Sequence, residues 1–224
     1  EGCMTMESAE IRICPVCEAR FQSVTPLCTG SHAADSDFRP HFWGADPLGA
    51  QVQSCEECGF SGYAQDYLDG VEESVLRKIR KFLSPRVRDI SLPDTAFYKY
   101  EFLALIYEWE DRSSLEVGDS FLRASWMART VANREKERLY QREAVRRFEE
   151  ALEIGECEDP ETRAVVSYLV GDIHRRLNRR RRAEGWFLRA REEYDLLEER
   201  TRTSVEWLGD QIARQMESPC DMLD

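Results

Sequence analysis

Four cysteines stand in two C-x-x-C motifs, Cys14 with Cys17 and Cys55 with Cys58. Each motif places two thiols on one tight turn, and two such motifs supply the four thiolates of a tetrahedral metal site. Zinc favours this soft, closed ligand set, and a single iron ion is the minor alternative. A lone C-x-x-C motif would also suit redox chemistry, but two matched pairs favour a metal. We therefore expect these cysteines to bind one structural zinc ion.

The segment between the two motifs holds a second set of reactive side chains, namely Asp35, Asp37, Arg39 and His41. Carboxylates and a histidine suit a second metal or acid–base chemistry, and positions i and i+2 of an extended segment share one side. Arg39 would lie on that side as well. The favoured alternative is a structural network, in which the aspartates cap turns and Arg39 pairs with either carboxylate. A binding surface or a catalytic site stays open at this stage.

The composition narrows the class of protein. The chain has 224 residues, a formal net charge of −12 and 42% hydrophobic residues. An acidic balance disfavours a general nucleic-acid binder but leaves room for a local basic patch. The first residues lack the pattern of a secretory signal, and no apolar run approaches the roughly 18 residues of a membrane span. We therefore expect a cytoplasmic protein that does not cross a membrane and whose cysteines are reduced.

Four cysteines stand outside the two motifs and follow no spacing rule. We expect them to be ordinary thiols, with Cys28 a distant candidate for a substitute metal ligand. They are Cys3, Cys28, Cys157 and Cys220.

The chain changes character near residue 70. Residues 8–70 carry short apolar runs broken by turn residues, which is typical of a small loop-and-strand module that a metal would stabilise. From Val71, apolar residues recur at helical spacing, and Ser84-Pro85 is expected to end the first helix. The further helices are expected at Phe97–Glu110, Leu115–Arg129, Glu135–Ile154, Glu161–Leu177, Arg182–Glu199 and Ser204–Met216. We therefore expect an α+β, mainly α protein, with a zinc-ribbon-like module at 8–70 and a helical region at 71–217.

A ladder of small and aromatic residues marks the helical region. Gly171 is followed by Ala183, Phe187 and Ala190, and Ala144, Phe148 and Ala151 repeat the ladder upstream. Small residues let two helices approach closely, and the phenylalanine fills the groove beside them. The pattern resembles tetratricopeptide helical hairpins, and a plain helical bundle is the alternative. If the hairpins stack, they present a surface that suits a partner protein.

Several motifs together resemble one family. Cys-Pro-Val-Cys, the segment Asp35–His41, the pair Asp46-Pro47 and Cys-Glu-Glu-Cys-Gly-Phe are similar to the bacterial DUF2225 family. The resemblance covers most of the chain and implies a cysteine module followed by repeat-like helices. It implies no particular activity. Glu18 departs from the glycine that commonly follows the first C-x-x-C motif of that family.

The leading hypothesis is a zinc-stabilised adaptor that binds a partner protein through its helical surface, and a catalytic role is less favoured because known catalytic motifs are absent. The alternatives are nucleic-acid binding through arginine clusters and, less favoured, a metalloenzyme or redox protein. One cluster contains Arg175, Arg176 and Arg179–Arg182; the other contains Arg77, Lys78, Arg80, Lys81, Arg86 and Arg88. The last helix is expected to cap the array through Val205, Leu208, Ile212 and Met216. The oligomeric state stays open.

Overall fold

The computed structural model describes residues 7–26, 30–90, 95–218 and 222–223. Cys3, Cys28 and Cys220 lie outside these residues. Within them the protein is mainly helical, with small antiparallel strand pairs near its N-terminus, so the expected fold class is confirmed.

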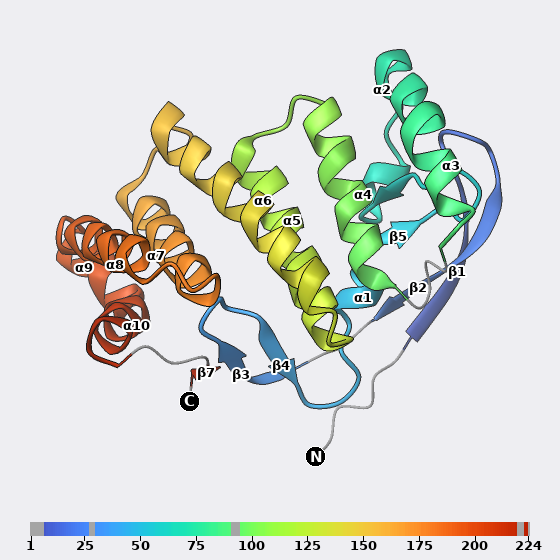
Figure 1. Ribbon diagram of the computed structural model, residues 1–224. Coiled ribbons are helices and arrows are strands. Elements are labelled where there is room, and N and C mark those ends of the chain that lie inside the picture. The colour runs from blue at the N-terminus through green and yellow to red at the C-terminus, as the bar shows by residue number, and fades with distance from the viewer. Residues whose placement is uncertain (1–6, 27–29, 91–94, 219–221, 224) are drawn as a thin grey trace.

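Five long helices form the body of the protein, and each packs against the next along the chain (Figure 1). They are α4 (Ala96–Trp109), α5 (Ser114–Thr130), α6 (Arg134–Ile154), α7 (Pro160–Arg176) and α8 (Arg180–Asp195). Side-chain caps begin three of them, because Ser113, Asn133 and Asp159 each accept a backbone N–H of the first turn. Such caps satisfy amides that have no partner within the helix. The expected Arg182–Glu199 helix is too long, since α8 ends at Asp195.

The cysteine module consists of short hairpins. Strands β1 (Glu7–Ile13) and β2 (Arg20–Pro26) pair antiparallel, as do β5 (Gln53–Ser54) and β6 (Ser61–Gly62). Strand β3 (Ser31–Asp35) pairs with β4 (Pro40–Phe42) and with β7 (Met222–Leu223). The end of the chain therefore returns to the hairpin that lies between the two cysteine motifs.

Short helical segments surround that module. They are α1 (Leu48–Gln51), the 3₁₀ turn Gln65–Tyr67, α2 (Glu73–Lys78), the π-helical turn Ile79–Leu83 and α3 (Ser84–Val87). The expectation that Ser84-Pro85 ends the first helix is wrong, because the chain stays helical to Val87. Proline has no backbone N–H to donate, and its ring crowds the preceding turn. The π-helical turn stands immediately before Ser84, where such a widening accommodates the proline.

Helix α4 joins the module to the helical body. Its Phe102 and Ile106 pack in one apolar cluster with the buried cysteines and with Val75 of α2. Its other buried side chains, among them Tyr100, belong to the cluster shared with α5 and α6. A helix that is apolar on all sides is typical of such a buried position. The division at residue 70 stays a prediction, and α4 shows that the two parts share a core.

Two helical hairpins use the same close contact. Gly171 of α7 lies against the ring of Phe187 of α8, and a β-carbon placed on Gly171 would stand 2.8 Å from that ring. Gly118 of α5 meets the ring of Phe148 of α6 in the same way, at 2.7 Å. Gly118 lies about two helical turns farther from the turn that joins α5 and α6 than Gly171 lies from the turn that joins α7 and α8. The two hairpins therefore share this contact but not its position along the helices.

The Gly171 contact predicts opposite results for two glycine-to-alanine substitutions. Alanine stabilises a helix over glycine by about 1 kcal/mol. Gly185→Ala should show this gain in urea unfolding, because no atom lies within 4 Å of the added carbon. Gly171→Ala should instead lower the free energy of unfolding by at least about 1 kcal/mol, because the Phe187 ring is buried and must move. Equal gains at both positions would show that the helices separate freely.

The last helices cover the end of the array. After α9 (Glu199–Ser204), helix α10 (Glu206–Glu217) packs on α8. Val205, Leu208 and Ile212 are buried as expected for a capping helix, whereas Met216 is 45% exposed. Gly209 allows this approach, since an added β-carbon would meet the Tyr194 ring at 2.7 Å.

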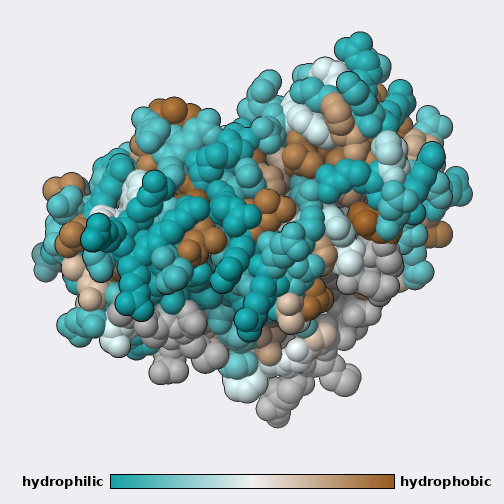
Figure 2. All heavy atoms as spheres, in the orientation of Figure 1, coloured by the Kyte–Doolittle hydropathy of each residue, from teal (hydrophilic) through white to brown (hydrophobic). Residues whose placement is uncertain are grey.

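One face of the molecule is mostly hydrophilic. The face in Figure 2 carries hydrophobic side chains only in small separate spots. Across the described ranges, no helix has both the length and the apolar character to cross a membrane.

Candidate metal centre

The two C-x-x-C motifs form the turns of two hairpins. In the first, between β1 and β2, the backbone N–H of Cys14 donates to Ala19 and that of Glu18 donates to Cys14. In the second, between β5 and β6, Cys55 donates to Phe60 and Gly59 donates to Cys55. The residue after the second cysteine of each motif has a positive φ, 62° at Glu18 and 80° at Gly59. Both motifs therefore end in a left-handed turn, which forms at Glu18 without glycine.

The four sulfur atoms converge on one point. They all lie within 4.8 Å of one another, and the pairs Cys14–Cys58 and Cys17–Cys55 are each 3.5 Å apart. A zinc–sulfur distance of about 2.3 Å places the sulfurs of a tetrahedral site about 3.8 Å apart, so this cluster fits such an ion. Cys14, Cys55 and Cys58 are buried and Cys17 is exposed. The cluster could therefore hold a metal ion close to the surface.

Neighbouring side chains enclose the buried side of the cluster. Phe60 and Tyr67 meet edge to face at 5.0 Å, and the Tyr67 hydroxyl donates to the carbonyls of Gln53 and Phe60. Ser84 donates to the carbonyl of Cys58. These contacts fix the second motif against α3 and keep water from the inner sulfurs.

Hydrogen bonds among the sulfurs shift the pKa values of the thiols. The pKa values of Cys14 and Cys58 are raised and the pKa of Cys55 is lowered, chiefly through the hydrogen bonds among these three sulfurs. Thiolate repulsion in a partly buried cluster opposes a second negative charge. A divalent cation would offset half of the negative charge of four thiolates here.

The two turn residues predict a matched pair of substitutions. Glu18→Gly should raise the free energy of unfolding by about 0.5–1 kcal/mol, because glycine adopts a positive φ without steric cost. Gly59→Ala should lower it by roughly 1–3 kcal/mol, since the added carbon would meet Leu83 at 3.0 Å and Phe102 at 3.4 Å. Glu18→Ala is the control that removes the charge and keeps the strain. Chemical unfolding at fixed metal concentration measures all three, and a gain for Glu18→Ala equal to that for Glu18→Gly would assign the effect to charge.

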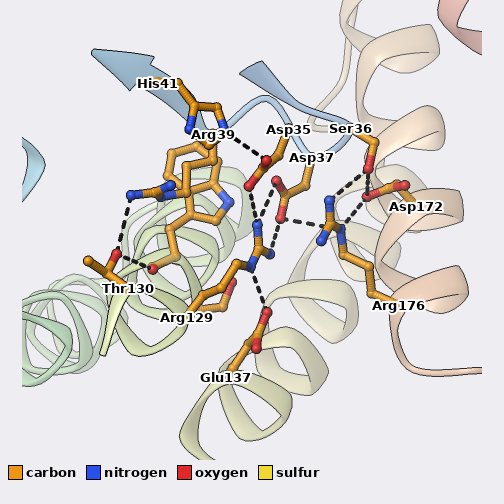
Figure 3. A network of polar contacts seen from close by, with 12 residues as sticks. Asp35, Ser36, Asp37, Arg39, His41, Arg129, Thr130, Glu137, Asp172 and Arg176 are labelled. Carbon is orange, nitrogen blue, oxygen red and sulfur yellow. Dashed lines mark hydrogen bonds and ion pairs between the residues drawn. The ribbon is translucent and has the colours of Figure 1, made fainter. Parts of the chain in front are cut away.

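The segment Asp35–His41 does not join this centre but contacts the helices (Figure 3). Arg129 of α5 pairs with Asp35 at 2.6 Å, with Asp37 at 2.5 Å and with Glu137 of α6 at 2.7 Å. Asp35 also pairs with His41 at 2.8 Å. Both carboxylates thus share one side, as expected, but the cation they face comes from a distant helix. Arg39 instead pairs with Asp46 at 2.8 Å, so its expected pairing with Asp35 or Asp37 is wrong.

The tip of the same segment is anchored on α7. Ser36 donates to Asp172, and Arg176 pairs with Asp172 at 2.8 Å. Asp37 is fully buried, and burial alone would raise its pKa, but Arg176 and Arg129 outweigh burial and lower it. Phe38 stacks on Tyr168 and meets Trp207 edge to face. The carboxylates are therefore occupied by cations of the protein itself, which fits the structural network rather than a second metal. Arg129, Asp172 and Arg176 carried no signal in the sequence for this role.

The two arginine clusters have different surroundings. In the cluster that runs from Arg77 to Arg88, Arg86 pairs with Glu101 and Arg80 donates to the carbonyl of Val16. In the cluster that runs from Arg175 to Arg182, Arg175 and Arg176 turn inward to Asp172. Arg179–Arg182 form no side-chain hydrogen bond or ion pair within the described part of the chain. The turn between α7 and α8 therefore carries four neighbouring arginines without an ion-pair partner among the described residues, while Arg77, Lys81 and Arg88 keep the other cluster exposed as well.

Comparison with known proteins agrees with this architecture. No match is found among curated proteins or among solved structures. A family profile described as an uncharacterized protein conserved in bacteria matches residues 8–205, which include all four clustered cysteines and every helix from α4 to α8. The match covers most of the chain, and the protein therefore belongs to the DUF2225 family.

Proposed function

We propose that Cys14, Cys17, Cys55 and Cys58 bind one zinc ion and that the ion has a structural role. Support comes from the spacing of the sulfurs and from the soft donor set. Four protein ligands leave no open position for a substrate, which is typical of structural zinc. When bound, the ion supplies cross-linking between the two hairpins. Reduced cysteines that bind a metal also favour a reducing compartment such as the cytoplasm.

Elemental analysis of the natively purified protein tests the metal. One zinc ion per chain and a colourless solution are expected. Iron would give visible absorbance and would replace zinc in the analysis. Less than a tenth of an ion per chain, with the protein folded, would contradict the proposal.

The protein as a whole acts as a scaffold whose helical surface binds another protein. The observation that carries this proposal is that, among the described residues, the two sets of reactive side chains singled out in the sequence are already engaged. The cysteine cluster is closed, and the carboxylates of the segment Asp35–His41 are paired with Arg129 and Arg176. Exposed apolar side chains remain on the last helices, namely Leu188, Leu196, Trp207 and Met216. Helical hairpins of the tetratricopeptide kind use such surfaces for binding.

Cross-linking in bacterial cells followed by affinity purification tests the scaffold. One partner should be recovered in stoichiometric amount and should be lost in the Leu196→Glu or Leu188→Glu variant. Leu68→Glu is the matched control, because Leu68 is as exposed as Leu196, at 73% and 72%, but belongs to the cysteine module. Recovery of no stoichiometric partner under several growth conditions would count against the proposal.

Nucleic-acid binding is the second candidate, and the unpaired Arg179–Arg182 are the observation that favours it. Phosphate contacts make the affinity fall steeply with salt. A fluorescent oligonucleotide should then bind in low salt and be released as salt rises, and a flat response would remove this candidate. The net charge of −12 opposes it.

A further inference from the structure

Arg179–Arg182 form a dense positive cluster that the fold does not use. The last three are exposed, and none of the four is paired with a carboxylate of the described residues. They stand at the beginning of α8, whose first turn has no acidic residue. Positive charge at this end of a helix, and neighbouring like charges, both lower stability. The cluster therefore costs the folded state some stability, and an anionic ligand would reverse that cost.

An apolar recess adjoins the cluster. It has a volume of about 630 Å³ and lies between α8 and α10. Its apolar wall consists of Ala183, Phe187, Leu188 and Met216. The side chains of Leu188 and Met216 are 53% and 45% exposed, so they form a hydrophobic rim. This volume lies within the usual range of ligand sites.

The recess and the cluster are continuous. A second, more open recess of about 570 Å³ is lined by Asn178 and Arg179–Arg182. Asn178 and Arg180 line both recesses. An occupant can therefore place an apolar group between the helices while its charged groups lie against the arginines. We call this surface the α8 corner, defined by Asn178, Arg179–Arg182, Leu188 and Met216.

We propose that the α8 corner binds an acidic peptide segment that carries one bulky apolar side chain. The apolar side chain enters the recess between α8 and α10, and the adjacent carboxylates pair with Arg180, Arg181 and Arg182. Arginine forms strong charge-assisted hydrogen bonds with carboxylates. This inference rests on the proposed scaffold function and names the chemistry of the partner.

Two observations favour a peptide over a nucleic acid. Single-stranded nucleic acids are held by exposed aromatic rings on which bases stack. The aromatic ring of the recess, Phe187, is only 2% exposed and lies against Gly171. The arginines also occupy one turn rather than a track, and Glu184 lines the recess beside them. A short acidic segment suits this limited surface.

Selection from a phage-displayed library of random 12-residue peptides tests the inference on the full metal-loaded chain. Enriched sequences should combine Asp or Glu with an adjacent Leu, Met or Phe. A fluorescein-labelled synthetic copy of the best sequence is then titrated by fluorescence anisotropy. The double variant Arg180→Glu/Arg181→Glu should weaken binding by about tenfold or more, and Leu188→Asp should also weaken it.

A matched control separates local from general charge effects. Arg138→Glu/Arg142→Glu makes the same change in net charge at two exposed positions of α6 and should leave the affinity within about twofold. The Arg180→Glu/Arg181→Glu variant should melt no lower than the wild type, because acidic residues favour the first turn of a helix. Its loss of binding would then not come from unfolding.

Several outcomes would overturn the inference. In the selection, these are enrichment of peptides without acidic residues, or enrichment on the wild type that is no greater than on Arg180→Glu/Arg181→Glu. In the titration, they are equal affinity of Arg180→Glu/Arg181→Glu and the wild type for the peptide, or displacement of the peptide by a 12-nucleotide single-stranded RNA that binds more tightly. If the cross-linked partner is retained by Arg180→Glu/Arg181→Glu, the scaffold function stands and the α8 corner is excluded. If cells yield no partner and the library no peptide, both proposals fail.

Discussion

Replacing Cys55 by serine should remove the metal and unfold the cysteine module. Structural zinc contributes binding free energy on the order of 10 kcal/mol in small zinc modules, and three remaining thiols cannot keep the closed site. Cys55 is buried and lies in one cluster with Phe102 and Ile106 of α4. The loss should therefore extend to that face of α4, while α5–α8 keep their own clusters.

Two measurements follow this effect. The metal content measured by elemental analysis should fall from one ion per chain to less than a tenth of an ion. Hydrogen exchange followed by mass spectrometry should show lost protection in β1, β2 and residues 48–90, with protection retained in α5–α8. Cys157→Ser is the control, since Cys157 is also buried but lies beyond the cluster and should keep its metal content. A Cys55→Ser variant that retains both its ion and its thermal transition would contradict the proposed site.

Replacing Arg129 by methionine should have the second-largest effect. Arg129 neutralises Asp35 and the fully buried Asp37, and it joins them to Glu137. Removing one partner of a buried ion pair typically costs about 3–5 kcal/mol when the remaining charge has no other partner. Because Arg176 stays 3.5 Å from Asp37, we expect a loss at the lower end of this range. Arg129→Lys should lie between the wild type and Arg129→Met, because lysine keeps the charge but not the planar fork. Urea unfolding at neutral pH measures the three proteins.

The matched control is Arg146→Met. Arg146 pairs with Glu143 on the surface of α6, and its side chain is 55% exposed. Such exposed pairs contribute less than about 1 kcal/mol. If Arg129→Met costs no more than Arg146→Met, the contacts of the segment Asp35–His41 do not hold the module on the helices.

The same pair predicts a pH dependence. The folded-state pKa of Asp37 is lowered, and the cations that outweigh its burial are Arg176 and Arg129. A carboxylate with a lowered pKa contributes stability above its unfolded pKa of about 3.9, and this contribution is lost as the pH falls through the folded value. The difference between wild type and Arg129→Met should therefore be full above about pH 4 and shrink below it. A difference that stays constant down to the acid transition would show that the contact does not depend on the Asp37 charge.

Local spacing was enough to predict much of this protein. The four clustered cysteines were identifiable because the geometry of a C-x-x-C turn is set within a few residues. The long helices were predicted to within about two residues at most of their ends, because apolar periodicity is also local. The positive φ of Gly59 belongs to the same local C-x-x-C turn.

The tertiary structure alone decided how these parts meet. The cations that face Asp35 and Asp37 come from Arg129 on α5 and Arg176 on α7, far along the chain, and nothing local marks that pairing. The shared core at α4 and the recess beside Arg180 depend in the same way on packing between distant segments. Turn and helix patterns are determined by neighbours in the sequence, whereas ion pairs and recesses are determined by neighbours in space.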